Sequence, residues 1–317
     1  MKINKIIPLI GLLFFIYILY SIGPEKIVST FLIIKPELFL LALIFFIPRM
    51  LLYSIKWQYL CTLQKMKISL PDVIKIFLIS LFYGSVTPGG VGYYIRIYYI
   101  KEKCKTTIEK CITNSLIDSA TGFIGGLLLS LIGSVFLLQT NPGLFPTFLF
   151  AFIIYLTIFI FFMKKERGNK TVQYLVKPFI PDRFKTRIDH SLKSLYADIP
   201  SLTKIPQILV FEIVLWIIGA FQVWIIAQSF QISVPIHIFI LMSIIAAMAG
   251  SLPISIGGLG VREGTLVYLL ASYGVTAEIA FVIALSGFLV KKLLPGLIGL
   301  PLSYKFKAQK YLLDTGK

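Results

Sequence analysis

Long runs of apolar residues, separated by short polar segments, dominate the pattern of the chain. Six of these runs are close to the roughly 20 residues that a helix needs to cross a bilayer, and we expect each to be a full membrane span. The predicted spans are Ile6 to Ile22, Leu38 to Ile55, Ile112 to Leu138, Leu144 to Met163, Ile208 to Phe230 and Ala277 to Leu300. The pattern therefore predicts an all-α, polytopic integral membrane protein.

Two further apolar segments, Val73 to Ile100 and Ile236 to Tyr273, are interrupted by glycine and proline. The interruptions are Thr87-Pro88-Gly89-Gly90-Val91-Gly92 and Leu252-Pro253-Ile254-Ser255-Ile256-Gly257-Gly258-Leu259-Gly260. Exposed backbone N–H or C=O groups are costly in hydrocarbon, so irregular backbone persists at membrane depth only where protein buries it or a wet cavity borders it. A matched pair of such breaks is typical of a transport site, and we expect both segments to be re-entrant hairpins.

Lysine and arginine near the ends of spans indicate the cytoplasmic side, because positive residues are retained there. The loops around Asn141, Gln231 and Ser272 carry neither residue, whereas positive charges gather before the first span and at residues 56–67, 101–110, 164–204 and 291–317. Both termini are therefore predicted to be cytoplasmic. With this orientation the first hairpin enters from the cytoplasm and the second from outside, which is an inverted-topology repeat. The alternative is that glycine and proline are simply frequent in transmembrane helices.

We interpret residues 1–317 as a single transmembrane domain. Residues 38–139 form the first predicted repeat unit, and residues 208–303 form the second, inverted unit. Residues 164–207 form a cytoplasmic linker in which Asp182 to Ile199 places apolar residues at helical spacing. This spacing predicts an amphipathic helix on the inner leaflet, with a partner-binding helix as the alternative.

Composition agrees with a membrane protein and argues against a soluble domain or a nucleic-acid-binding protein. Hydrophobic residues make up 57% of the chain, charged residues 14%, and the mean hydropathy is +0.87; soluble domains carry about 25% charged residues. The net charge of +17 lies in short loops without a basic, aromatic-rich domain, so we expect no nucleic-acid partner. Cys61, Cys104 and Cys111 show no CxxC spacing, so we expect no metal site, disulfide framework or cofactor.

The residues that follow the two breaks are candidates for binding an anion. Arg96 follows the first break, and Arg262-Glu263 follows the second. A half-helix that begins after a glycine turn presents free N–H groups and the positive end of its dipole, and a guanidinium adds a bidentate phosphate contact. Alternatively, Arg96 only opens a basic loop, and Glu263 only neutralises Arg262 or caps its helix. The glycines predicted to approach the substrate are Gly89, Gly90, Gly92, Gly257, Gly258 and Gly260.

Asp118 lies inside the span that follows the first break. A carboxylate within a membrane span is a functional candidate, which pairs with an arginine or carries a coupling proton. The alternative is a structural ion pair. We interpret Arg49, Lys291 and Lys292 as side chains that snorkel to the interface.

At these residues the chain resembles the flippase-like transmembrane region of lysylphosphatidylglycerol synthases. The resemblance rests on Pro88-Gly89-Gly90-Val91-Gly92 through Arg96, on Asp118 and, most specifically, on Pro253-Ile254-Ser255-Ile256-Gly257-Gly258-Leu259-Gly260-Val261-Arg262-Glu263-Gly264. In that family an arginine often follows the aspartate, whereas Ser119 does so here, which argues against an ion pair local to that helix. The resemblance implies a polytopic flippase-like fold and transport of a lipid headgroup between leaflets.

We therefore expect a stand-alone flippase-like transporter of the cell membrane, whose partner is an anionic phospholipid or a polyprenyl phosphate. We expect no enzyme activity, because the sequence shows no Walker A lysine, no dinucleotide fingerprint and no convincing nucleophile and base pair. The printed sequence also ends soon after Lys305, without an aminoacyltransferase domain. The alternatives left open are a membrane-embedded transferase acting on a lipid phosphate and a non-catalytic scaffold of a cell-envelope synthesis complex. Self-association into a homo-oligomer also stays open.

Overall fold

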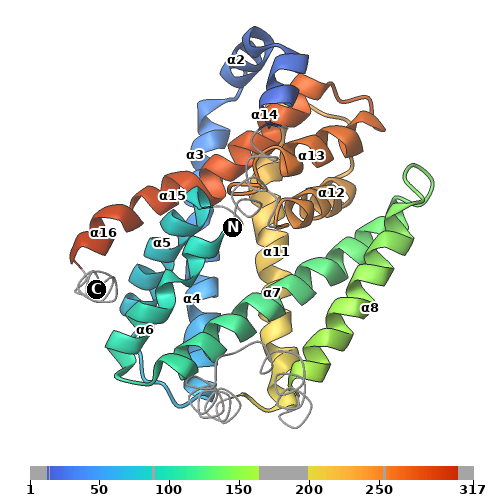
Figure 1. Ribbon diagram of the computed structural model, residues 1–317. Helices are drawn as coiled ribbons and strands as arrows, with labels where there is room; N and C mark the ends of the chain where they lie inside the picture. Colours follow the sequence, from blue (N-terminus) through green and yellow to red (C-terminus); the bar gives the residue numbers. More distant parts are fainter. Residues whose placement is uncertain (1–12, 14, 88–89, 164–198, 253–254, 306–317) are drawn as a thin grey trace.

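A computed structural model describes residue 13 and residues 15–87, 90–163, 199–252 and 255–305 (Figure 1). Every regular element in these residues is a helix, which confirms the predicted all-α class. The predicted first span, Ile6 to Ile22, falls partly outside them, although residues 15–22 are helical. Five described helices are long and apolar enough to cross a membrane, and they match the other five predicted spans: Pro36–Leu63, Ile108–Phe136, Leu144–Met163, Ile205–Phe230 and Ala277–Tyr304.

The first described elements are α2 (Pro24–Leu32), α3 (Pro36–Ile44) and α4 (Phe46–Leu63). Proline occupies the first turn of α2 and of α3, where a backbone N–H would have no acceptor within the helix, so its absence costs no hydrogen bond. Helices α3 and α4 meet at Phe45 and together form one membrane-crossing unit.

The first break separates α5 (Leu70–Val86) from the 3₁₀ helix η1 (Val91–Ile95), which continues into α6 (Arg96–Cys104). Gly90 adopts a left-handed conformation with φ of 66°, which favours glycine. The chain then turns back so that η1 packs against α5. A Cβ atom on Gly92 would lie 2.3 Å from the carbonyl oxygen of Tyr83, so this close approach also requires glycine.

The long helix α7 (Ile108–Phe136) packs against α8 (Leu144–Met163) and α11 (Ile205–Ala227). Helix α8 contains no buried residue, as expected for a helix that faces lipid. Close packing of α7 depends on small residues: a Cβ atom on Gly126 would lie 2.3 Å from Met248 Sδ and 2.7 Å from Trp216 Cζ2. The short helices η4 (Leu202–Lys204) and η5 (Gln228–Phe230) flank α11.

The second break separates α12 (Ile236–Ala249) from α13 (Val261–Ala271), and these two helices pack against each other. The last span runs without a gap in helical structure from α14 (Ala277–Phe288) through the π-helix η6 (Leu289–Leu293) to α15 (Leu294–Leu297), with α16 (Gly299–Lys305) following. Helices α15 and α16 lie along α5, the first half of the first broken segment (Figure 1).

The order of elements repeats in the two halves of the chain. In the first half α4 precedes a broken helix and α7 follows it; in the second half α11 precedes a broken helix and α14 follows it. The halves pack together through α7 against α11 and α12, and through α5 against α15 and α16. Residues 164–198 of the predicted linker 164–207, and with them nearly all of its amphipathic segment Asp182 to Ile199, lie outside the described residues, so the prediction of an amphipathic helix stays untested.

Candidate functional site: a polar cavity between two glycine turns

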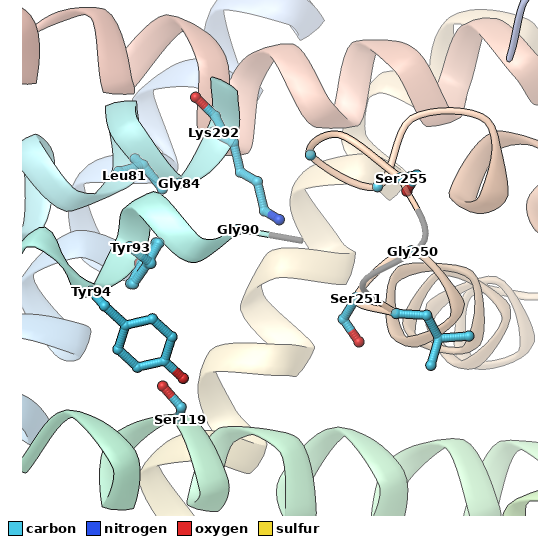
Figure 2. A pocket seen from close by; sticks show the side chains of 14 residues that line it. Leu81, Gly84, Gly90, Tyr93, Tyr94, Ser119, Gly250, Ser251, Ser255 and Lys292 are labelled. Carbon is cyan, nitrogen blue, oxygen red and sulfur yellow. The ribbon is translucent and has the colours of Figure 1, made fainter. Parts of the chain in front are cut away.

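The two glycine turns meet in the structure. A Cβ atom on Gly257 would lie 2.7 Å from the carbonyl oxygen of Ser85, so the backbone of the second turn touches the end of α5. A cavity of about 230 Å³ lies between the turns, and Figure 2 shows the side chains around it. We call it the inter-turn cavity. Its polar lining includes backbone from Gly90, Gly257 and Gly258, together with the side chains of Ser119, Ser251, Ser255, Tyr94 and Lys292.

A second cavity of about 320 Å³ adjoins the first, because Tyr93, Ser119, Ser251 and Lys292 line both. We call it the Arg49 cavity. Arg49, Lys291 and Glu212 contribute charge to its lining, and Phe123, Leu215 and Trp216 contribute apolar surface. The two cavities together offer positive and hydroxyl groups next to an apolar wall.

A network of buried charges lies beside the Arg49 cavity. Arg96 Nη1 donates to Asp118 Oδ2 at 2.6 Å, and the hydroxyl of Tyr53 donates to the same oxygen at 2.7 Å. Lys56 Nζ lies 2.6 Å from Asp118 Oδ1 and also donates to the carboxylate of Glu212. Two cations and two carboxylates therefore form one network, whose formal charge is zero.

Burial makes this pairing necessary. The exposed fraction is 0% for Lys56, 1% for Arg96 and 5% for both Asp118 and Glu212. Removing one partner of a buried ion pair typically costs about 3–5 kcal/mol, because the other charge is left uncompensated. The network thus joins α4, α6, α7 and α11, and it supports the structural alternative for Asp118. The arginine that pairs with Asp118 is Arg96 of α6, so the ion pair is not local to the helix of Asp118, as the sequence indicates.

Arg262 and Glu263 form a second neutral pair at the start of α13. Arg262 Nη2 donates to Glu263 Oε1, and the Arg262 guanidinium lies 4.8 Å from the ring centroid of Phe288. The other carboxylate oxygen of Glu263 accepts the N–H of Gly260 at 2.6 Å. Both roles considered for Glu263 are therefore confirmed, since it neutralises Arg262 and caps the helix. The N-terminus of α13 already holds a carboxylate of its own chain.

The structure separates the predicted site residues into groups. Gly90, Gly257 and Gly258 line the inter-turn cavity. Gly92 and Gly260 use their N–H groups within the turns, and Gly92 donates to Thr87 Oγ1 at 2.7 Å. Gly89 lies outside the described residues. The remaining four, Arg96, Asp118, Arg262 and Glu263, are engaged in the ion pairs above, and substrate binding by any of the ten residues stays a prediction.

Three cations that the sequence placed at the membrane interface line the cavities instead. They are Arg49, Lys291 and Lys292. Figure 2 shows the side chain of Lys292 reaching from its helix into the space between Gly90 and Ser255. The sequence carried one signal for this position, because both lysines lie well inside the apolar run from Ala277 to Leu300 rather than at its end.

The helix around these lysines is irregular for a local reason. Pro295 has no N–H, so it cannot donate to the carbonyl of Lys291 as a residue in a regular α-helix would. The segment Leu289–Leu293 adopts a π-helical turn, a feature frequent at functional sites. Arg49 Nη1 donates to the carbonyl oxygen of Lys291 at 3.3 Å. The proline thus leaves an acceptor that holds Arg49 next to the lysines.

Comparison with known proteins places the chain in a family of membrane proteins. The family described as lysylphosphatidylglycerol synthase TM region matches residues 6–299. A UPF0104 membrane protein of Methanocaldococcus jannaschii is 20% identical over 317 residues, with 94% of each chain covered. A UPF0104 membrane protein of Methanothermobacter thermautotrophicus is 19% identical over 296 residues, which cover 87% of this chain and 88% of that protein. The matches indicate a multi-pass membrane protein with a function related to membrane lipids.

Proposed function

We propose that this protein, which belongs to the family of lysylphosphatidylglycerol synthase TM regions, moves the headgroup of an anionic lipid between the leaflets of the cell membrane. The lipid is an anionic phospholipid or a polyprenyl phosphate. One observation carries the proposal: two broken helices meet around a cavity that hydroxyl groups and a lysine line, inside a bundle of helices long and apolar enough to cross a membrane.

The surroundings of the cavity support transport. Large apolar side chains are exposed on the outside of the bundle, for example Phe150, Ile153 and Ile158 on α8. Polar groups are costly in hydrocarbon, and inside a membrane protein they are retained where other protein groups, water or a polar ligand satisfy their hydrogen bonds. Irregular backbone between half-helices is also where transporters bind their substrates.

The repeated order of elements supports an alternating mechanism. We propose that both broken segments are re-entrant hairpins, that the second unit is inverted relative to the first, and that both termini are cytoplasmic. One turn then approaches the cavity from each side of the membrane. Movement of the two units against each other would open the cavity to one leaflet at a time, and transport needs no chemical step.

Leaflet exchange in liposomes tests this proposal. The purified protein is reconstituted into phosphatidylcholine vesicles that contain a trace of fluorescent phosphatidylglycerol or fluorescent polyprenyl phosphate, and dithionite quenches the outer leaflet. We expect at least one of the two lipids to exchange faster than in empty vesicles. We expect Arg262→Gln to slow this exchange, because Glu263 would lose its partner and the second turn its support.

The control variant is Lys67→Gln, which removes an exposed cation in the segment between α4 and α5. Its exchange rate should equal that of the wild type. If neither lipid exchanges faster than in empty vesicles under any imposed ion gradient, the transport proposal fails and the scaffold alternative gains support.

A further inference from the structure

We infer that Arg49, Lys291 and Lys292 bind the headgroup, and that this headgroup is a lipid phosphomonoester or diphosphate rather than a phosphodiester. This inference rests on the proposed function, and it assigns the binding role to three residues other than Arg96 and Arg262. We call the three residues the cation triad. All three line the Arg49 cavity, and Lys292 lines the inter-turn cavity as well.

The count of charges around the cavities supports the triad. Lys56 and Arg96 are balanced by Asp118 and Glu212, and Arg262 is balanced by Glu263. Within the described part of the chain, by contrast, no carboxylate oxygen lies within 4.0 Å of a triad nitrogen. Three formally cationic side chains that line the cavities thus lack a carboxylate partner among the described residues. Charges at this depth are retained where a ligand or a counter-ion compensates them.

Contacts with neighbouring residues fix the positions of the triad side chains. Arg49 is fixed by its hydrogen bond to the carbonyl of Lys291, and Gly219 of α11 makes room for it, since a Cβ atom there would lie 3.3 Å from Arg49 Nε. Lys292 is exposed to the cavity space. The π-helical turn presents the two neighbouring lysines to the same cavity. A ligand therefore meets three cations from two spans.

Unpartnered polar atoms also point to a ligand. Ser255 Oγ, Ser243 Oγ and Arg49 Nε are buried, and none finds a hydrogen-bond partner among the described residues. Ser255 is 1% exposed and lines the inter-turn cavity, while Ser243 is 5% exposed and lines the Arg49 cavity. Buried polar groups are normally satisfied, so these donors are suited to the oxygens of a bound phosphate.

The excess charge favours a polyanionic headgroup. A phosphomonoester carries about −1.5 to −2 charges at neutral pH, and a diphosphate carries more, whereas a phosphodiester such as phosphatidylglycerol carries only one. A diester would leave most of the triad uncompensated. The apolar wall formed by Phe123, Leu215 and Trp216 offers a contact for a lipid tail, which a free phosphate would not use.

Binding to the purified protein in an uncharged detergent tests the inference. Four probes are titrated by calorimetry: farnesyl diphosphate, farnesyl phosphate, short-chain phosphatidylglycerol and inorganic pyrophosphate. We expect the two farnesyl compounds to bind about tenfold or more tightly than the phosphodiester and the inorganic ion, as one lost charge-assisted contact or the lost tail would predict.

Matched variants assign the site. Lys291→Gln and Lys292→Gln should each weaken binding of farnesyl phosphate about tenfold, whereas Lys67→Gln should not change it. The charge-retaining variants Lys291→Arg and Lys292→Arg should recover part of the affinity. An unchanged melting temperature and a single peak in size-exclusion chromatography show that each variant is folded.

Three results would overturn the inference. They are equal affinity for the phosphodiester and the phosphomonoester, equal affinity for inorganic pyrophosphate and farnesyl diphosphate, and unchanged affinity in both lysine-to-glutamine variants. Rapid exchange of phosphatidylglycerol in liposomes together with any of these results would leave the proposed transport standing and reject only the triad. Tight triad-dependent binding without leaflet exchange would support the triad and reject the proposed transport.

Discussion

At the scale of single residues, Lys56 sets the charge of the buried network because its amine contacts Asp118 and Glu212 together. The side chain is fully buried in α4, and its two partners come from α7 and α11. Arg96 compensates the remaining negative charge through Asp118. Each cation in this network therefore compensates a carboxylate that is 5% exposed.

Replacement of Lys56 by methionine should destabilise the protein strongly. Lys56→Met keeps a long unbranched side chain but leaves one negative charge unbalanced in the core, so we expect the free energy of unfolding to fall by about 3 kcal/mol. Thermal unfolding in detergent measures the change, with Lys67→Met at an exposed position as the control. Equal melting temperatures for the two variants would contradict the role of Lys56.

Sequence reasoning predicted some of these contacts and not others, for a physical reason. Glu263 follows Arg262 directly and lies in the first turn of a helix, so its two roles were visible from adjacency alone. The pair of Arg96 and Asp118 spans 22 residues and depends on the exact turn at Gly90 and η1. The arrangement of the cation triad depends on a π-helical turn that apolar periodicity does not indicate.

At the scale of elements, the two glycine turns line one cavity together with the end of α5 and with η1. Gly258 has φ of 84°, and a Cβ atom on it would lie 2.6 Å from the carbonyl oxygen of Gly250. Either feature alone disfavours a side chain, because the conformation favours glycine and the neighbouring atom belongs to backbone that cannot rotate away. The turn therefore tolerates no other residue without a shift of α12 against α13.

Substitution of Gly258 by alanine should displace the second turn. We expect Gly258→Ala to lower the free energy of unfolding by about 1–3 kcal/mol and to slow leaflet exchange. The matched control is Gly143→Ala in the loop before α8, where a Cβ atom would meet no atom within 4 Å. Equal stability and equal exchange in the two variants would show that the turn is not a tightly packed element.

The membrane-crossing elements were predictable because each is long and apolar. Five of the predicted spans agree with described helices, and most ends differ by a few residues, although the span predicted to end at Ile55 continues to Leu63. The start of α7 at Ile108 rather than Ile112 is one example, since Thr107 caps the helix by accepting the N–H of Lys110. Apolar content locates a span, but capping residues determine where its helix begins.

At the scale of the whole molecule, the proposed alternating mechanism depends on how the chain is oriented in the membrane. The loop around Asn141, between α7 and α8, carries no positive charge, whereas the segment between α4 and α5 carries Lys65 and Lys67. The distribution of positive charge predicts that the first loop faces outside and the second faces the cytoplasm. With this predicted orientation, we expect the two broken segments to enter from opposite sides.

Single-cysteine labelling tests the orientation. Gln139 and Lys67 are both exposed, so Gln139→Cys and Lys67→Cys provide matched positions. They are introduced with Cys104 replaced by serine, because the other native cysteines, Cys61 and Cys111, are buried. An impermeant maleimide added to intact cells should label position 139 and should label position 67 only after permeabilisation. The opposite pattern would reverse the proposed topology.

The cation triad is proposed to hold a lipid phosphate where the Arg49 cavity adjoins the inter-turn cavity. A crystal or cryo-EM structure of the protein with bound farnesyl phosphate tests it most directly. The account predicts phosphate density within hydrogen-bonding distance of Lys292 and of Lys291 or Arg49, with the tail against Trp216 and the Arg96 to Asp118 pair intact. Phosphate density on Arg96 or Arg262 with their carboxylate partners displaced, or cavities without lipid at saturating ligand, would contradict it.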